Sequence, residues 1–158
     1  ESINENFNGN LNIKFEDIQN NFLKSGLINI SFTDSRINLV NNTFNINKIG
    51  TLNLKENKFV EIEDKLYFKS SIQIKIENQD EFYRKFSIPK KNRINLKNIF
   101  FVLEKDVDNE NYYISNIKVN SSDEIKILDD QKSNYEKIKI SNIQQLRKVS
   151  QNVFESLN

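Results

Sequence analysis

The chain has 158 residues and a formal net charge of +1, and it contains no cysteine, histidine, methionine or tryptophan. Without cysteine it has no disulfide, no thiolate nucleophile and no cysteine zinc site, and without histidine it has no Ser-His-Asp or Cys-His catalysis. The balanced charge, with no clustered basic face, argues against a nucleic-acid partner, and the length suits one domain with a real core.

Apolar and polar residues alternate along most of the chain, which predicts short strands with one buried face. The first run covers residues 11–15, and a ladder of further runs follows over residues 27–76. Parallel strands need long crossovers, whereas these runs are only a few residues apart, so we expect an antiparallel meander. Asparagine and aspartate supply the turns, because both tolerate a left-handed backbone. The predicted turns are Asp34-Ser35, Asn41-Asn42-Thr43, Lys55-Glu56-Asn57 and Glu63-Asp64-Lys65.

Three segments have helical rather than alternating spacing. The first covers residues 16–24. The second, residues 78–86, begins with a capping-box pattern, Asn78-x-x-Glu81. The third, residues 142–157, carries an apolar stripe at three- and four-residue steps behind a second capping box, Ser141-x-x-Gln144. We therefore expect two short helical segments and a C-terminal amphipathic helix.

Two longer strands are predicted between the second and third helices, at residues 93–104 and 111–119. The acidic stretch between them, Asp106-Val107-Asp108-Asn109-Glu110, is similar to the start of a calcium-binding loop. Such a loop requires glycine at its sixth position and a bidentate acid at its twelfth, where this chain has Asn111 and Ile117. We therefore interpret the stretch as a hairpin turn.

These elements predict an α+β fold that is mainly antiparallel β: a curved meander sheet with two short helical segments and a C-terminal amphipathic helix. Residues 1–158 form a single β-rich domain or a fragment of a larger chain, with the strand ladder at 27–76, strands at 93–119 and the helix at 142–157. Residues 121–136 are interpreted as a loop or a short edge strand. Because the chain begins at Glu1, we expect a fragment or a processed product.

No side chain in the sequence stands out as catalytic. Paired carboxylates hydrolyse glycosides without histidine, but the acidic residues fall mainly at turns and on the polar side of strands, where solvated charges belong. Residues 82–86 interleave basic and aromatic side chains, as in some single-strand binders. We prefer inward packing of Phe82 and Phe86, because the chain lacks net basic charge. The expectation is a non-enzymatic chain with no metal, no cofactor and no nucleic-acid partner.

The apolar residues of the ladder alternate along their strands and are expected to share one sheet face. This face either closes as an ordinary core under the helices or a second sheet, or it remains an open apolar trough that holds lipid chains. Both interpretations stay open at this point. The candidate lining residues of a lipid groove are Ile28, Ile30, Phe32, Ile37, Leu39, Phe44, Ile46, Leu52, Leu54, Leu66, Phe68, Ile72, Ile74 and Ile76.

The succession of elements from about Leu11 onward is similar to that of a known family. It passes through residues 38–54, 65–76, 82–86, 88–93, 96–99 and 113–117, and it closes in the helix that carries Leu146-Arg147-Lys148. In this order and texture the chain resembles the C-terminal region of AsmA-like envelope proteins from AT-rich alphaproteobacteria.

The resemblance implies a non-enzymatic periplasmic module, held at the inner membrane by an upstream anchor that lies outside this chain. It implies a role in outer-membrane biogenesis or in phospholipid transport between membranes through an apolar β-groove, with the ladder residues as its lining. It supplies no catalytic residue, and the protein partner stays unknown. The alternative is a structural or protein-interaction β-domain with a closed core, which acts through edge strands or through the C-terminal helix.

Overall fold

A computed structural model describes residues 8–16, 22–33, 36–109, 111–121, 125–127, 138–140 and 142–157. The strands of this part of the chain join in one antiparallel sheet of order β1-β2-β4-β5-β6-β7-β8-β10, with β3 beside β2 and β9 beside β8. The strands are β1 (Gly9–Phe15), β2 (Leu23–Thr33), β3 (Arg36–Leu39), β4 (Asn42–Ile46), β5 (Gly50–Ile62), β6 (Lys65–Ile76), β7 (Leu96–Asp106), β8 (Tyr112–Ser121), β9 (Ile125–Ile127) and β10 (Ile138–Ile140). The helices are α1 (Gln79–Phe86), the 3-10 turn η1 (Lys90–Asn92) and α2 (Ile143–Ser156).

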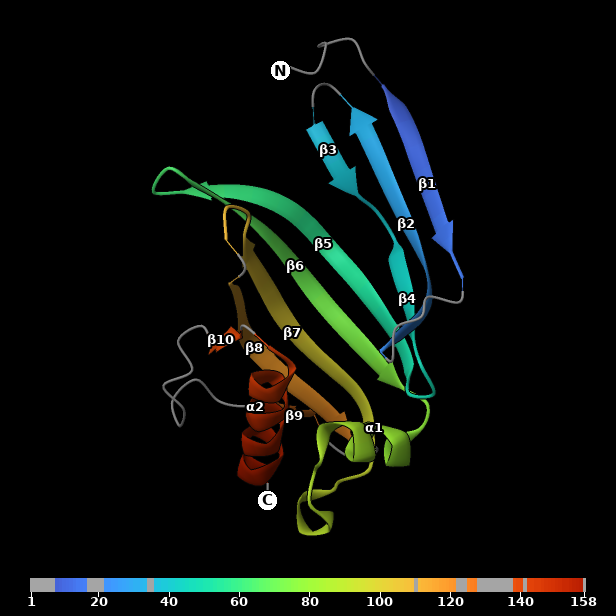
Figure 1. The fold of residues 1–158 in the computed structure, drawn as a ribbon, viewed down its shortest axis with the longest axis vertical. Coiled ribbons are helices and arrows are strands. Elements are labelled where there is room, and N and C mark those ends of the chain that lie inside the picture. The colour runs from blue at the N-terminus through green and yellow to red at the C-terminus, as the bar shows by residue number, and fades with distance from the viewer. Residues whose placement is uncertain are drawn as a thin grey trace.

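The sheet is strongly curved, and α1 and α2 lie on the same side of it (Figure 1). The first three strands extend away from the helices, at the end of the molecule that carries the N-terminus (Figure 1). The predicted α+β class, with a mainly antiparallel meander and a C-terminal helix, is confirmed. The helices therefore cover only part of the sheet that the described residues form.

The centre of the sheet is a long hairpin of β5 and β6. The sequence pattern wrongly predicts a turn inside β5. The turn predicted at Lys55-Glu56-Asn57 is instead a β-bulge inside β5, where the pairing with β6 shifts between Lys55 and Lys58. Glu56 has a positive φ of 51°, so the segment bends like a turn while the strand continues. A bulge inserts an extra residue and increases the local twist, which fits the curvature of this hairpin.

The other predicted turns differ in outcome. The turn at residues 63–65 is confirmed, because Glu63 and Asp64 both have positive φ, as a tight hairpin turn requires. At residues 41–43 only Asn41 (φ 54°) forms the turn, and β4 already begins at Asn42. The turn expected at residues 34–35 lies outside the described residues.

The helix predicted at residues 16–24 is wrong for its described end. Leu23 and Lys24 begin β2, and Leu23 pairs with Ile46 of β4. The pairing partner decides the conformation here, because a short apolar group such as Phe22-Leu23 fits helical and strand spacing equally well. Residues 17–21 lie outside the described residues.

Both remaining helices are confirmed, and asparagine caps each of them. The Asn78 Oδ1 accepts a hydrogen bond from Glu81 N at 3.1 Å at the start of α1, as the sequence predicts. At the start of α2 the Asn142 Oδ1 accepts from Gln145 N at 2.9 Å. The cap predicted at Ser141 is therefore one residue too early. The Asn142 side chain caps the helix by accepting from a first-turn amide that has no partner within the helix.

A tight connection fixes α1 over the sheet. The Ile49 carbonyl, in the turn between β4 and β5, accepts hydrogen bonds from Glu77 N at 2.8 Å and Asn78 N at 3.0 Å. Gly50 follows with a φ of 153°, and a Cβ at this position would clash with the Lys75 carbonyl oxygen. The glycine thus permits the close approach of β5 and β6 that places the start of α1.

At the C-terminal end of the sheet, β7 and β8 match the strands predicted at 93–104 and 111–119 within about three residues. Their antiparallel pairing confirms the hairpin between them. For residues 121–136 the sequence left a loop or a short edge strand open, and the described residues Ile125–Ile127 form the short strand β9 beside β8. The strand β10 has no counterpart in the prediction, and it pairs with β8 at the edge of the sheet beside α2.

Candidate functional site

The lining residues expected from the sequence all lie on one face of the sheet, which we call the apolar face. Residues directly opposite each other on paired strands point to the same side. Such partners join Ile30 to Leu39, Phe44 to Leu52, and Leu52 in turn to Ile74. The remaining members follow at two-residue steps along the same strands. The register therefore places the whole predicted set together.

The bulge in β5 changes which side chains of the hairpin tip join this face. Beyond the bulge, Phe59 stands opposite Phe68 and the two rings are 5.4 Å apart between centroids. An uninterrupted alternation from Leu54 would have placed Val60 on the apolar face instead. The extra residue keeps the aromatic side chain on the apolar side.

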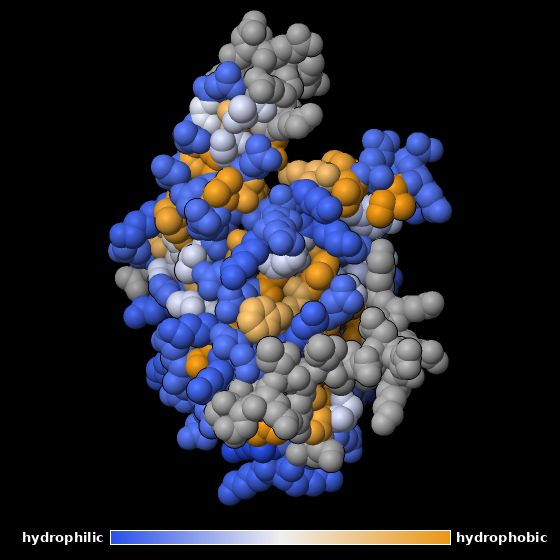
Figure 2. Space-filling view, turned by 180° about the vertical axis from the view of Figure 1, so that it is seen from behind, coloured by the Kyte–Doolittle hydropathy of each residue, from blue (hydrophilic) through white to orange (hydrophobic). Residues whose placement is uncertain are grey.

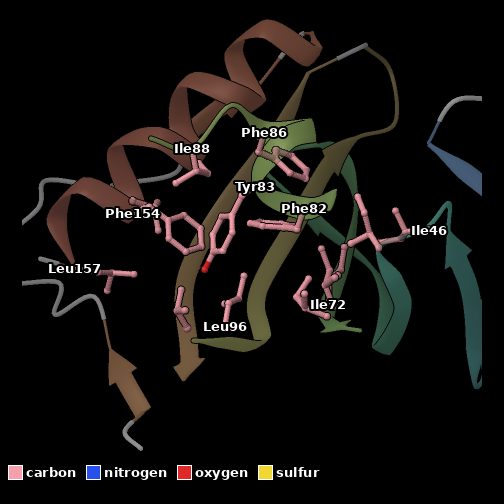
Figure 3. Packing of buried hydrophobic residues seen from close by; sticks show 14 residues of the cluster. Ile46, Ile72, Phe82, Tyr83, Phe86, Ile88, Leu96, Phe154 and Leu157 are labelled. Carbon is pink, nitrogen blue, oxygen red and sulfur yellow. The ribbon is translucent and has the colours of Figure 1, made fainter. Parts of the chain in front are cut away.

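One part of the apolar face, which we call the covered half, is packed against α1 and α2. The α2 ring of Phe154 is only 1% exposed and lies 5.8 Å from the Phe82 ring and 5.9 Å from the Tyr83 ring of α1 (Figure 3). The α1 rings in turn face the strands that carry Ile46 and Ile72 (Figure 3). The aromatic layer of α1 thus packs against both the sheet and α2.

Tyr83 also supplies a polar contact between α1 and the chain that follows it. Its hydroxyl donates to the Ile94 carbonyl at 2.5 Å and accepts from Ile94 N at 3.2 Å. Burial raises the pKa of Tyr83 above its usual value, because the ionised form would lose its hydration. The Arg93 guanidinium lies 5.2 Å from the centroid of the same ring. The Tyr83 hydroxyl is therefore a buried structural hydrogen-bonding group.

Two side chains of α2 attach this helix to the end of α1. Arg147 Nε donates to the Lys85 carbonyl and Gln151 Nε2 donates to the Ser87 carbonyl, both at 3.1 Å. The last carbonyls of a helix have no partner within the helix, so both bonds satisfy groups that would otherwise need water. Arg147 and Gln151 are four residues apart and therefore share one face of α2.

A cavity of about 290 Å³ lies between the covered half and the helices. Its walls are almost entirely aliphatic and aromatic, and among the described residues that line it only Tyr112 and Ser150 carry side-chain hydroxyls. It is lined by Phe22, Leu52, Ile72, Ile74, Phe82, Phe86, Ile99, Phe101, Leu103, Tyr112, Ile114, Ile117, Val119, Ile140, Leu146, Val149, Ser150, Val153 and Phe154.

Sequence reasoning finds only part of this lining. Of the predicted groove residues, Leu52, Ile72 and Ile74 line the cavity, while Ile46 and Ile76 belong to the buried core around it. The contribution of β7 and β8 was missed, although Ile99, Phe101 and Leu103 alternate in the same way as the ladder. The predicted groove lining ends at Ile76. The same period-two pattern, extended to β7, identifies these three residues.

The rest of the apolar face, which we call the open half, comprises β1 to β3 and the tip of the β5–β6 hairpin. It holds the predicted residues Ile28, Ile30, Phe32, Ile37, Leu39, Leu66 and Phe68, of which Ile37 and Leu66 are exposed. The two remaining predicted residues lie elsewhere: Phe44 is on β4, and Leu54 of β5 packs against the buried core. Leu11 and Ile13 of β1 add to the exposed apolar surface. Seen from behind, the molecule is mainly hydrophilic with separate small apolar groups (Figure 2).

The buried acidic side chains of the described residues have structural partners. Glu104 Oε1 lies 2.9 Å from Lys69 Nζ. Asp106 accepts hydrogen bonds from Asp108 N, at 3.1 Å, and from Asn109 Nδ2, so it holds the hairpin turn. Both acids lie on β7 opposite residues of β6, on the sheet face that points away from the apolar face. Neither of them lines the cavity.

Two kinds of feature, a metal-binding cluster and a membrane-spanning helix, are absent from the described residues. These residues contain no group of three or more histidine, cysteine, aspartate or glutamate side chains placed to hold a metal ion. They also contain no helix that is both long enough and apolar enough to cross a bilayer. The comparisons with known proteins found no match to the chain, whether among family models, curated proteins or solved structures.

Proposed function

We propose that the chain is a non-enzymatic lipid-binding module that encloses an acyl chain between its sheet and its helices. The observation that carries this proposal is the apolar cavity of about 290 Å³ against the covered half. Protein interiors are normally packed without voids larger than a water molecule, because each missing contact costs dispersion energy. A space of this size with almost no polar wall suits an apolar ligand better than water.

The cavity is large enough for a useful binding energy. An engineered apolar cavity of roughly 150 Å³ binds benzene or xenon, and this one has about twice that volume. At roughly 30 Å³ for each water-sized group, it accommodates about ten carbon atoms of a chain. Each buried methylene contributes about 0.8 kcal/mol. A chain of that length would therefore bind through burial alone, with no directional contact required.

The open half would extend this role. Its exposed side chains continue the same face along β1 to β3, so longer acyl chains could lie along it while the covered half encloses one end. This is the arrangement that the resemblance to AsmA-like proteins suggests, and it motivates the proposal of a periplasmic module in phospholipid transport or outer-membrane biogenesis. The membrane anchor and the protein partners belong to that same proposal.

A second candidate function is protein interaction through the sheet edge. The edge strand β1 exposes Leu11 and Ile13, at 47% and 41% of their residue surface. An exposed strand edge with apolar residues is a natural site for pairing with another chain. This function would leave the cavity without a role.

The test is the lipid content of the purified protein, measured by extraction and mass spectrometry. We expect co-purified acyl chains in the wild-type protein. The variant Val149→Phe places a ring in the cavity from α2 and should lower the bound lipid several-fold. Ile143→Phe is the matched control, because Ile143 is exposed on the same helix and does not line the cavity.

Equal lipid content in the wild type and in Val149→Phe would contradict binding in the cavity. A wild-type protein that carries no lipid, and takes up none from vesicles of phosphatidylethanolamine and phosphatidylglycerol, would contradict the lipid function itself. In that case, pairing with another chain through β1 becomes the better account.

A further inference from the structure

The mouth of the cavity is marked by one exposed aromatic residue. Of the lining residues in the described part of the chain, Tyr112 alone is exposed, with 38% of its surface accessible, while the others are buried or half-buried. It lies at the start of β8, where the β7–β8 hairpin reaches the edge of the covered half. A chain in the cavity would therefore leave it beside the Tyr112 ring.

A cation lies beside this mouth. Lys105 is directly opposite Tyr112 on β8 and directly opposite Phe68 on β6, so it belongs to the apolar face. Its ammonium nitrogen is 5.6 Å from the centroid of the Tyr112 ring. Among the paired positions of that face from β1 to β8, no other carries a lysine or arginine. A charge at such a position is unusual, because an apolar face normally excludes it.

The ammonium group is held in place by the hairpin turn. Lys105 Nζ donates to the Asp106 and Asn109 carbonyl oxygens, each at 3.2 Å. An ammonium group has three protons to donate, so these two bonds leave one for a ligand. Within the described residues no carboxylate lies within 4.0 Å of this nitrogen. The charge is thus positioned by neutral carbonyls.

We propose that the ligand is a single-chain amphiphile with an anionic head group, which Lys105 binds at the mouth while the chain fills the cavity. This inference rests on the proposed function and deepens it by naming the ligand class. The anion would accept a charge-assisted hydrogen bond from Lys105 Nζ, and it would lie at the rim of the Tyr112 ring. The carboxylate of a fatty acid and the phosphate monoester of a lysolipid share this chemistry.

The experiment compares ligands built on ten-carbon chains with different head groups. Decanoate, decyl phosphate, decanol and decyltrimethylammonium would compete with a neutral fluorescent probe, N-phenyl-1-naphthylamine, for the wild-type protein. Both anions should bind roughly tenfold more tightly than decanol, as one hydrogen bond to a charged group allows. The cation should bind most weakly, and the tighter of the two anions indicates a fatty acid or a phosphate lipid.

Two variants locate the charge. Lys105→Gln should remove the preference for both anions and leave the affinity for decanol within about twofold of the wild type. Lys139→Gln is the matched control, because Lys139 is an exposed lysine at the same end of the sheet whose partner Tyr113 lies on the opposite face. It should keep the anion preference.

The outcomes separate this inference from the proposed function. If the wild type binds decanol as tightly as the anions, or if Lys105→Gln keeps the preference, the head-group assignment is wrong while chain binding stands. If no ten-carbon ligand displaces the probe, the proposed function and this inference both fail. Loss of decanol binding in Lys105→Gln would show that the lysine only supports the fold, which also overturns the assignment.

Discussion

The covered and open halves of the apolar face have the same sequence pattern and different surroundings. Both carry mainly isoleucine, leucine and phenylalanine at the alternate positions of antiparallel strands. In the covered half, the α1 rings and Phe154 of α2 reduce the exposure of Ile72 to 5%. In the open half, Ile13 occupies an equivalent alternate position and is 41% exposed.

This difference teaches that alternation specifies a face and not its burial. Hydrophobic stabilisation depends on the apolar area removed from water, so identical side chains contribute unequally in the two halves. The covered half buries more apolar area and therefore contributes more to the stability of the described fold. It also contains the cavity. The open half leaves apolar surface available for a ligand or a partner.

The largest effect is expected for Phe154→Ala. This substitution removes a fully buried ring from between α2 and α1 and leaves a larger cavity, so we expect a loss of about 3–5 kcal/mol in the free energy of unfolding. Urea denaturation followed by circular dichroism measures it. A loss below about 1 kcal/mol would show that the covered half is not the stabilising region.

A smaller loss is expected for Tyr83→Phe, which keeps the ring and removes the hydroxyl. Ile94 then lacks the partner for its amide and its carbonyl, which costs about 1–3 kcal/mol near neutral pH. The raised pKa of Tyr83 adds a pH dependence. Its contribution is fully present below the unfolded pKa of about 10 and is lost as pH rises from there through the folded pKa.

The measurement is a series of urea titrations from pH 8 to pH 11.5 on both proteins. The wild type should lose stability above pH 10 more steeply than Tyr83→Phe does. Parallel curves for the two proteins would mean that the buried hydroxyl does not titrate with a raised pKa.

Removing the N-terminal cap of α2 should destabilise the covered half less than the two substitutions above. Asn142→Ala removes the acceptor for Gln145 N and should cost about 1 kcal/mol, measured as a lower midpoint of thermal unfolding. Gln144→Ala is the control, since Gln144 is exposed in the first turn and lies after the cap. If both variants unfold at the same temperature, the cap assignment is incorrect.

The smallest effect is expected in the open half. Ile13→Thr keeps a β-branched side chain and should change the free energy of unfolding by less than about 0.5 kcal/mol. Its matched partner in the covered half, Ile72→Thr, should cost more than about 2 kcal/mol, because it shrinks the core and buries a hydroxyl. Equal losses at the two positions would remove the distinction between the halves.

Local patterns predict the strands other than β10 and both of the later helices, because period and capping are properties of neighbouring residues. Local patterns give the wrong conformation where pairing with a strand distant in the sequence determines the structure. The Lys55-Glu56-Asn57 stretch has turn chemistry, and only its continued pairing with β6 makes it a bulge. The spacing around Leu23 suits a helix, but Leu23 belongs to a strand because it pairs with Ile46.

The candidate site divides in the same way. Alternation places Leu52, Ile72 and Ile74 on the face that borders the cavity, so these were predictable. The cavity itself depends on how far α1 and α2 stand from the sheet, which is set by the packing of Phe82 and Phe154 and has no local signal. The position of Lys105 beside Tyr112 depends on the register of β7 and β8, which the turn length alone does not fix.

The most direct test is a crystal structure of the protein soaked with a decanoate that carries bromine on its last carbon. The account predicts anomalous bromine density inside the cavity, near the α1 rings and Phe154, with the carboxylate near Lys105. Bromine density confined to the open half, or none at all beside a cavity closed by packed side chains, would contradict it.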